Sequence, residues 1–496
     1  MRTSELVEAA EVFVGGRFVP AIDGTRADVI EAATEQVMGR VVLGGPADID
    51  AAVTAARAGT RAWSAVPPAT RAALLDRYAA ALDARAEETA RDVSRQNGMP
   101  ITWSRVVNGH LPGTLVRYYA DLIRGEVPVD VRPGLRGVRT RVEHRAVGVV
   151  AAITPWNYPQ ALAAMKIAPA LAAGCTVVLK PSPETSLDAY TFAQAALDAG
   201  LPPGVVNIVP GGREVGSHLV AHPGVDKVAF TGSSAAGKQI GETCGRLLRP
   251  VTLELGGKSA AILTEDVDLP TYLKKILRVS LPNTGQTCHS STRILAPRSR
   301  YREIVDAVTD TVRSFRVGDP LDERTQIGPV VTAAHRARIL NYIEAGRASG
   351  ARITTGGSTP TTKDRGWYVE PTVFADVDNS MTVAREEIFG PVLCIIPYAD
   401  EDEAVAIAND SEYGLAGTIW TPDEERGIAL AQRIESGTVG VNHYGLDPAA
   451  PFGGMKSSGI GRELGPEGLN AYLVTQSIYL PAPRGARSNT VGGDRT

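Results

Sequence analysis

The sequence predicts an α/β protein with two alternating blocks and a small separate β element. In the first block, between residues 147 and 255, short apolar runs alternate five times with helical stretches. Parallel strands need such crossover helices, so this block is expected to form a doubly wound parallel sheet. A second alternating block, from about residue 259, predicts a second α/β domain. Ligands of such sheets bind beyond the carboxyl ends of the strands.

The first block follows a helical region. Apolar residues recur at helical spacing between residues 48 and 97, and prolines at 67–68 separate two helices. The continuous apolar run 147–154 is typical of a strand buried on both faces. The strands predicted after it are 176–180, 205–209, 226–230 and 251–255, and the helices are about 160–173, from Ser186, near 213–221 and from about 235.

The second block and two shorter pieces complete the chain. A hairpin is predicted over 126–146, turning at "RPG", and a late strand in "TQSIYLP". Unattached hairpins often pair with another subunit. The tail, residues 486–496, is expected to be mobile. The strands predicted in the second block are "SAAILT", "TRILAP", "PVLCIIPY", "LAGTIWT" and "TVGVN".

Composition excludes several functional classes. The 496 residues are 44% hydrophobic and 21% charged, and the net charge of −4 gives no electrostatic reason to expect nucleic acid or anionic lipid as a partner. No apolar run approaches the roughly 18 residues that span a bilayer. The four cysteines have no CxxC pairing and no metal-ligand spacing. We expect free thiols in a reducing cytoplasm, and no metal.

One of the four cysteines lies in an unusual setting. Cys288 belongs to the polar stretch "TGQTCHSS", whereas Cys175 and Cys394 lie in apolar runs. A buried cysteine usually acts as a small hydrophobe. Cys288 is therefore either a nucleophile or a thiol carried by a tight turn. A Cys–His dyad with His289 is possible, although adjacent side chains usually point apart.

Three further motifs each permit two interpretations. Glu254, in "VTLELGGKS", is a general base or an ion-paired residue. Asn157, in "ITPWNYP", is an oxyanion donor or a turn former. The stretch "FTGSSAAGKQIG" is an anion site at a helix N-terminus or a tight turn built on Gly232 and Gly237. It is not a P-loop, because Gln239 stands where Mg²⁺ binding needs Ser or Thr.

Seven motifs taken together resemble one family. They occur in its order and extend over about residues 10 to 480: "PWNYP", "KPSPETS", "FTGSSAAGK", "LELGGKS", "GQTC", "EEIFGP" and "PFGGMKSSGIGRELG". The chain resembles the aldehyde dehydrogenase superfamily. The resemblance implies oxidation of an aldehyde to an acid with NAD(P), through a cysteine thioester that water hydrolyses.

The resemblance also implies catalytic roles. Cys288 matches the nucleophile, because a thiolate attacks carbonyls well and leaves as part of a thioester. Asn157, with the backbone N–H of Cys288, matches the oxyanion donors, and Glu254 matches the base that activates water. Lys166 matches a lysine linked to proton relay in some members, and a structural lysine is the alternative.

The implied cofactor is NAD, with NADP not excluded. Lys180 matches the ligand of the adenosine ribose, Ser233 that of the pyrophosphate, and Glu387 that of the nicotinamide ribose. Phe389 and Trp156 border the same pocket. Glycines shape the backbone turn beside Ser233. The implied cofactor-binding set is Trp156, Lys180, Gly232, Ser233, Gly237, Glu387 and Phe389.

The chain departs from the family pattern at three places. Pro183 stands where many NAD-preferring members have a glutamate, and Glu184, one place later, is expected to point to the opposite side of an extended segment. Leu162 and Met165 suggest a wide, adaptable apolar tunnel. Val474 stands where some relatives have another glutamate, so Glu254 is the only base that a motif supports.

These inferences define an expected organisation. An NAD(P)-binding domain covers 1–124 and 147–255, a catalytic domain covers 256–455, and an oligomerisation hairpin and strand cover 125–146 and 470–485. The expected assembly is a homodimer or homotetramer that acts on a small-molecule aldehyde. A CoA-acylating enzyme and an inactive nucleotide-binding relative are the alternatives, and Glu254 favours hydrolysis because thiol transfer needs no water-activating base.

Overall fold

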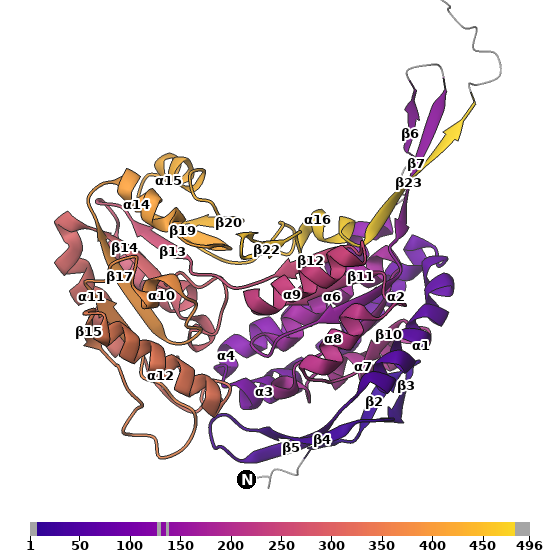
Figure 1. Ribbon diagram of the computed structural model, residues 1–496, viewed down its shortest axis with the longest axis horizontal. Helices are drawn as coiled ribbons and strands as arrows, with labels where there is room; N and C mark the ends of the chain where they lie inside the picture. The colour runs from indigo at the N-terminus through magenta and orange to yellow at the C-terminus, as the bar shows by residue number, and fades with distance from the viewer. Residues whose placement is uncertain (1–6, 126–129, 135–137, 482–496) are drawn as a thin grey trace, which may run out of the picture.

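Two α/β bodies lie side by side, and a narrow three-stranded ribbon projects from one of them (Figure 1). The structure is a computed structural model and describes residues 7–125, 130–134 and 138–481. The expected mobile tail and parts of the expected hairpin lie outside the described residues. No helix in the described part of the chain has the length and apolar character that crossing a membrane requires.

The first body is built on an eight-stranded sheet with the order β22-β12-β11-β8-β9-β10-β2-β3. The five strands from β12 to β10 are parallel, as predicted, whereas β2, β3 and β22 pair antiparallel at the two edges. The strands are β2 (Glu11–Val14), β3 (Arg17–Pro20), β8 (Val149–Ile153), β9 (Thr176–Lys180), β10 (Val206–Ile208), β11 (Lys227–Thr231), β12 (Val251–Glu254) and β22 (Gly459–Ile460).

Helices cover both faces of this sheet, which is therefore doubly wound. One apolar core lies between the sheet and α2, α5, α6 and α7, and a second lies under α1, α8 and α9. The helix predicted from Ser186 begins only at Tyr190, because a 3₁₀ turn, η2 (Pro183–Thr185), precedes it. The helices are α1 (Pro46–Ser64), α2 (Pro68–Asp83), α3 (Ala86–Asn97), α4 (Ile101–Ser104), η1 (Arg105–His110), α5 (Leu111–Arg124), α6 (Pro159–Ala173), α7 (Tyr190–Ala199), α8 (Arg213–Ala221) and α9 (Ser234–Arg246).

The second body contains a seven-stranded sheet with the order β15-β16-β17-β14-β13-β19-β20. Its strands are parallel except for β15, and apolar cores lie on both faces. The strands are β13 (Ala260–Leu263), β14 (Arg293–Pro297), β15 (Arg352–Thr355), β16 (Thr372–Ala375), β17 (Val392–Tyr398), β19 (Ala416–Trp420) and β20 (Thr438–Val441), and the helices and turns are α10 (Leu269–Ser280), η3 (Pro282–Gly285), η4 (Arg298–Arg300), α11 (Tyr301–Arg313), α12 (Ala333–Ala348), α13 (Thr382–Arg385), α14 (Glu401–Asn409) and α15 (Glu424–Ala431).

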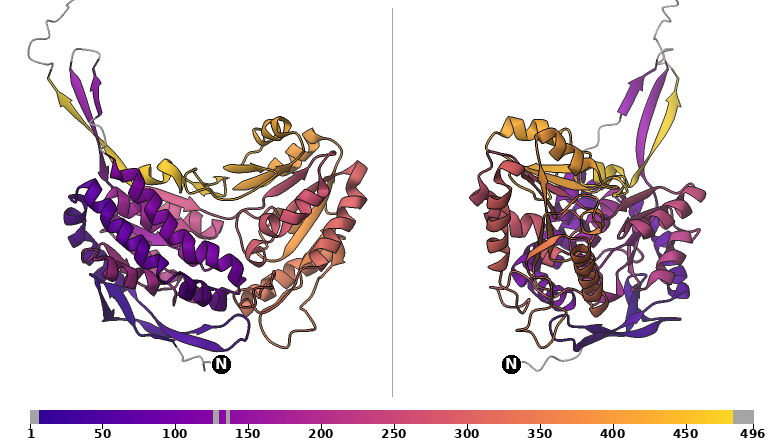
Figure 2. Two further views of the ribbon diagram at one scale, coloured as in Figure 1. Left: turned by 180° about the vertical axis from the view of Figure 1, so that it is seen from behind. Right: turned by 60° about the vertical axis from the view of Figure 1, so that its left-hand side comes forward.

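The projecting ribbon contains the predicted hairpin and late strand. Strand β7 (Arg139–Ala146) lies between β6 (Asp130–Pro133) and β23 (Leu473–Leu480), and both neighbours are antiparallel to it. Figure 2 shows from two further sides that the ribbon extends away from both bodies. Its exposed side chains include Val131, Val474 and Tyr479, the last of which is 79% exposed.

Several short elements were not predicted. A three-stranded sheet at the N-terminal end pairs β1 (Val7–Ala9), β5 (Val37–Leu43) and β4 (Thr25–Ile30) in the order β1-β5-β4. Near the C-terminal end, β18 (Tyr413–Gly414) pairs with β21 (Met455–Lys456), and α16 (Gly465–Asn470) follows β22. The chain thus returns to the first sheet after residue 455, where the expected catalytic domain ends.

Candidate active site

The expected cofactor residues meet where the order of the first sheet reverses. The chain passes from β8 through β9 to β10 on one side of β8 and then places β11 on the other side. A cavity of about 400 Å³ opens at the carboxyl ends of these strands. This is where doubly wound sheets bind dinucleotides. Its lining includes Trp156, Lys180, Gly232 and Ser233.

One end of the cavity carries both positive and negative groups. The buried Lys180 amine donates to the carbonyl oxygens of Gly211 (2.6 Å) and Pro181 (3.0 Å), and burial lowers its pKa to about 8. Glu184 and Arg213 line the same cavity. The expectation that Glu184 points away is wrong, because η2 is a 3₁₀ turn and the alternation of an extended strand does not apply.

The motif "FTGSSAAGK" forms the start of α9. The Ser233 hydroxyl caps this helix by accepting from the N–H of Ala236 at 3.3 Å. Gly237 packs so closely that an added Cβ would lie 2.4 Å from the Leu255 side chain. The helix N-terminus therefore faces the cavity with unpaired N–H groups, which suits a pyrophosphate.

The nucleophile loop is held by unusual backbone geometry. In η3, Asn283 and Thr284 have φ angles of 49° and 58°, a left-handed conformation that is rare for side chains other than glycine. A Cβ on Gly285 would lie 2.1 Å from the Gly390 carbonyl oxygen. The buried Asn157 amide donates to the Gln286 carbonyl at 3.0 Å. An amide nitrogen carries two hydrogens, so one donor is left for a ligand.

Cys288 is half-buried at the end of this loop. It packs against an apolar cluster that contains Tyr158, Leu162, Met165 and Phe452. Burial raises the pKa of the thiol, and the nearby carboxylates of Glu387 and Glu254 raise it further. The resting nucleophile is therefore a protonated thiol that needs a proton acceptor.

His289 does not act as that acceptor. Its ring stacks on Tyr444 at 5.0 Å and meets the edge of Phe452 at 6.3 Å, so it forms part of an aromatic wall beside the thiol. Burial lowers its pKa to about 4, and the ring is neutral at physiological pH. Tyr444 and Phe452 line a cavity of about 310 Å³. This cavity therefore adjoins the aromatic wall beside the thiol.

Glu254 is buried at the carboxyl end of β12. Its side chain is 2% exposed, and neither carboxylate oxygen has a hydrogen-bond partner among the described residues. Burial raises its pKa well above the usual range, and the charge of Glu463 raises it further. Because burial disfavours the charged carboxylate, proton uptake by Glu254 is favourable, which suits a general base.

Lys166 is paired with a residue that the sequence interpretation missed. Its fully buried amine donates to Glu463 Oε1 at 2.7 Å and to Thr231 Oγ1 at 2.5 Å. Glu463 belongs to the motif "GRELG", and that was the only available signal, because 297 positions separate the two residues. The charge of Lys166 also stabilises the ionised form of Glu254.

Glu387 and Phe389 lie near the nucleophile loop and line a small cavity with Thr287. Glu387 Oε1 accepts from the N–H of Gly257 at 3.0 Å, and burial raises the pKa of Glu387 to about 7. The ring of Phe389 meets Trp156 edge to face at 5.4 Å. The structure thus brings the expected catalytic and cofactor residues to one connected region between the two sheets.

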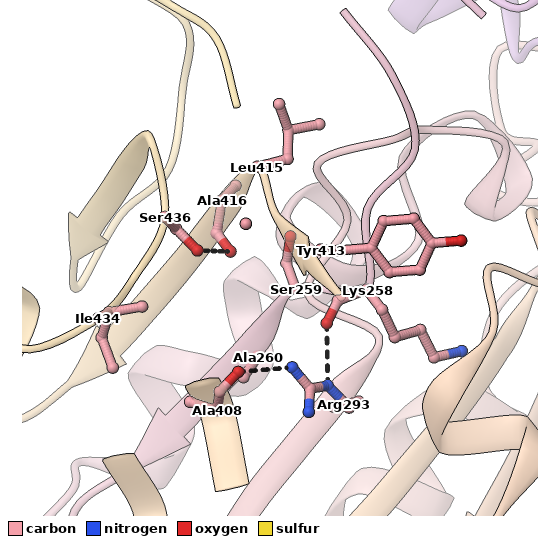
Figure 3. Close-up of a pocket in the computed structure, with 11 residues that line it drawn as sticks. Lys258, Ser259, Ala260, Arg293, Ala408, Tyr413, Leu415, Ala416, Ile434 and Ser436 are labelled. Carbon is pink, nitrogen blue, oxygen red and sulfur yellow. Dashed lines mark hydrogen bonds between the residues drawn. The ribbon is translucent and has the colours of Figure 1, made fainter. Parts of the chain in front are cut away.

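A buried arginine anchors the strand after the nucleophile loop. Figure 3 shows Arg293, the first residue of β14, with its guanidinium donating to the carbonyl oxygens of Lys258 and Ala408, each at 2.9 Å. Burial lowers its pKa to about 10. The cavity beside it measures only about 10 Å³, too small for a substrate. Arg293 therefore anchors the strand after the nucleophile loop and takes no part in the reaction.

The other three cysteines are buried, and none of the four is paired in a disulfide. Within the described residues, no group of three or more His, Cys, Asp or Glu side chains is placed to hold a metal ion.

Comparisons with known proteins agree with this geometry. A sequence profile described as "Aldehyde dehydrogenase family" matches residues 18–478. The geranial dehydrogenase of Castellaniella defragrans is 53% identical and covers 96% of this chain and 99% of its own. A Mycobacterium tuberculosis aldehyde dehydrogenase complexed with NAD⁺ matches with a TM-score of 0.94 and 45% identity, over 97% of this chain and 99% of its own.

A further solved structure contains both a cofactor and an aldehyde. A mutant of aldehyde dehydrogenase C from Pseudomonas syringae, complexed with NAD⁺ and octanal, has a TM-score of 0.92 and 41% identity, over 95% of this chain and 96% of its own. The chain belongs to the aldehyde dehydrogenase family: it is an NAD-dependent enzyme that oxidises an aldehyde to a carboxylic acid through a cysteine thioester, which water hydrolyses.

Proposed function

We propose that Cys288 attacks the aldehyde and that Asn157 stabilises the oxyanion. The observation that carries this proposal is the half-buried thiol, which meets an apolar cluster on one side and two carboxyl groups on the other. The free hydrogen of the Asn157 amide and the backbone N–H of Cys288 donate to the negative oxygen. The adjoining cavity would hold NAD⁺, which would supply the hydride acceptor, and the resulting thioester stays on Cys288.

Glu254 is the base of the second step. Its unpaired carboxylate takes a proton from the water that attacks the thioester carbonyl. Lys166 and Glu463, buried next to it, adjust its charge and form a route for the proton. This set of groups favours hydrolysis over transfer to CoA, because a thiol acceptor needs no water-activating carboxylate.

The cofactor-binding set keeps the roles that the resemblance implied. Lys180 and Ser233 hold the adenosine and pyrophosphate parts, and Trp156, Glu387 and Phe389 hold the nicotinamide part. The cavity fits such a ligand, because the exposed N–H groups of α9 and a buried amine both face it. Gly232 and Gly237 allow close packing of this turn, because an added Cβ would lie 2.4 Å from Phe230 at the first and 2.4 Å from Leu255 at the second.

The substrate is an apolar aldehyde of medium length. The thiol packs against the apolar cluster that contains Leu162 and Met165, and the 310 Å³ cavity is lined mainly by apolar and aromatic residues. The relative named geranial dehydrogenase and the neighbour that holds octanal support this class. The charged or titratable groups among the described lining residues of that cavity are His443, Tyr444 and Asp447.

A chain-length series tests the proposal. NADH formation is measured with butanal, hexanal, octanal, geranial and the cationic betaine aldehyde, each with and without CoA. We expect kcat/KM to rise about tenfold or more from butanal to octanal, because each buried methylene adds to transition-state binding. A flat series, or a preference for betaine aldehyde, contradicts the apolar class. Dependence of turnover on CoA contradicts hydrolysis by Glu254.

The projecting ribbon joins subunits in a homodimer or homotetramer. Three observations support this: the exposed apolar side chains of the ribbon, its distance from both bodies (Figure 2), and β20, which ends the second sheet without a further strand among the described residues. A stable monomer by light scattering at micromolar concentration contradicts it. A reducing cytoplasm remains part of the proposal, because all four cysteines are unpaired.

A further inference from the structure

One face of α12 contacts three residues of the loop that carries Glu387. His335, Arg338 and Tyr342 are spaced by three and four positions, so they lie on one stripe of the helix. We call these three residues the α12 stripe, and residues 386–389 the 386–389 loop. The stripe takes no part in the chemistry derived above.

Each member of the stripe bonds a different residue of the loop. His335 Nε2 lies 2.7 Å from the carbonyl oxygen of Phe389 and donates to it, because a carbonyl can only accept. Arg338 Nη2 donates to the carbonyl oxygen of Glu387 at 2.8 Å. The Tyr342 hydroxyl donates to Glu386 Oε2 at 2.6 Å.

The loop is held in a conformation that it would not adopt unaided. Phe389 has a φ of 63°, in the left-handed region that residues with a Cβ avoid. Such a conformation persists only when surrounding contacts fix it. The hydrogen bond from His335 falls on the carbonyl of this strained residue.

Aromatic contacts extend this restraint to the cofactor cavity. The His335 ring lies 5.2 Å from Trp156 and 6.0 Å from Phe389, and these two rings contact each other. Ile339, on the next turn of the helix, packs so close to Gly390 that an added Cβ there would lie 2.5 Å from its side chain. The loop is thus fixed between α12 and the groups around the cofactor.

We propose that the α12 stripe is a positioning device that fixes the 386–389 loop and so presents Glu387 and Phe389 to the nicotinamide half of the cofactor. The inference rests on the roles proposed above for these two residues. His335 and Arg338 are positioning residues, because they act through the loop. Their loss is expected to weaken NAD⁺ binding and slow hydride transfer, while hydrolysis by Glu254 is unaffected.

The test compares variants of α12 with a matched control on the same helix. His335→Leu and Arg338→Met remove the two bonds to loop carbonyls, and His335→Gln keeps an N–H donor. Arg336→Leu is the control, because Arg336 donates to the Gly366 carbonyl at 3.0 Å, in another segment. For each variant, calorimetry measures the Kd of NAD⁺, stopped flow measures the NADH burst with octanal, and a thermal scan measures Tm.

We expect His335→Leu and Arg338→Met each to raise the Kd of NAD⁺ about 3- to 10-fold, the loss expected for one hydrogen bond. The burst slows but keeps its amplitude. His335→Gln stays within about twofold of wild type, as does Arg336→Leu. Adding His335→Leu to Glu387→Gln causes little further loss, because both act on one contact.

Three outcomes overturn the inference. The first is an unchanged Kd of NAD⁺ in His335→Leu while Glu387→Gln raises it. The second is an equal loss of NAD⁺ affinity in His335→Gln and His335→Leu. The third is a loss of affinity in the double variant of His335→Leu and Glu387→Gln that equals the sum of the two single losses. Unchanged affinity in Glu387→Gln itself overturns the proposed role of Glu387 and the inference with it. The two failures are thereby distinguished.

Discussion

The two sheets share a plan but differ at their edges and in what they contribute to the site. The antiparallel strands β3 and β22 form the two edges of the eight-stranded sheet. One edge of the seven-stranded sheet is the half-buried strand β20. The first sheet supplies Glu254 from the end of a strand, where it is 2% exposed. The second supplies Cys288 from a half-buried loop before β14. The base is therefore enclosed, whereas the thiol stays accessible to substrate.

The largest expected effect tests the contribution of the second sheet. Cys288→Ala should reduce aldehyde oxidation by about three orders of magnitude or more, because no covalent intermediate can form. NAD⁺ binding, measured by calorimetry, should stay within about threefold of wild type. Oxidation near the wild-type rate would remove Cys288 from its role.

The next effect tests the contribution of the first sheet. Glu254→Gln should lower steady-state turnover by about 10²–10⁴-fold, the range for loss of a general base. A rapid-mixing experiment should still show a burst of up to about one NADH per site, because the acyl-enzyme accumulates. If the burst disappears together with turnover, Glu254 acts earlier, on the proton of the thiol.

A third prediction concerns the cofactor end of the first sheet. Pro183→Glu should shift the ratio of kcat/KM toward NAD over NADP by about one to two decades, because a carboxylate repels a 2′-phosphate across a partly buried site. Arg213, which lines the same cavity, should favour NADP, so Arg213→Ala should shift the ratio the same way. A ratio unchanged in both variants, with strong NAD preference in the wild type, would assign the discrimination to Glu184.

A smaller expected effect, on NAD⁺ affinity, concerns Glu387 in the region between the two sheets. The pKa of Glu387 is about 7, so its carboxylate is ionised above that pH and accepts from ribose hydroxyls. NAD⁺ affinity should therefore fall about three- to tenfold as the pH decreases from 8 to 6. Calorimetry at several pH values measures it, and Glu387→Gln should flatten the dependence. An equally steep dependence in that variant would point to another titrating group.

The smallest effect compares one buried cysteine from each sheet. The Cys175 thiol donates to the Tyr472 carbonyl at 3.5 Å, next to β9, and the Cys394 thiol donates to the Val383 carbonyl at 3.2 Å, from β17. Cys175→Ala and Cys394→Ala should each lower the free energy of unfolding by about 1 kcal/mol and leave turnover unchanged. Denaturant unfolding measures the first and NADH formation the second. A loss of turnover at full stability would contradict a purely structural role.

The sequence predicted the central strands of both sheets because they are continuous apolar runs. It did not predict β1 to β5. All but one of their pairings lie within the first 43 residues, and the remaining one, between Phe13 and Ile208, joins residues far apart in the sequence. The same distance hid Glu463, whose partner Lys166 lies 297 positions earlier. Glu184 was misplaced because a 3₁₀ turn depends on local backbone geometry, which the alternation rule ignores.

The family motifs located the individual site residues well but not their contacts. Nothing in "EEIFGP" indicates that His335 and Arg338 hold its carbonyls, because those bonds involve backbone atoms that carry no sequence signal. Likewise, the Asn157 amide donates one hydrogen to the Gln286 carbonyl, and only the fold brings these two residues together. That bond determines where the second amide hydrogen points. Contacts between segments are therefore what the structure adds.

The pairing of β22 with β12 and of Glu463 with Lys166 has a consequence for the order of synthesis. β22 and Glu463 both follow the last strand of the second sheet in the sequence. A ribosome adding about 5–20 residues per second completes the strands of the second sheet before these residues emerge. Until then the Lys166 ammonium lacks its counter-charge and Glu254 lies at an open sheet edge. The buried surroundings of Glu254 and Lys166 therefore form only after the second sheet has been synthesised.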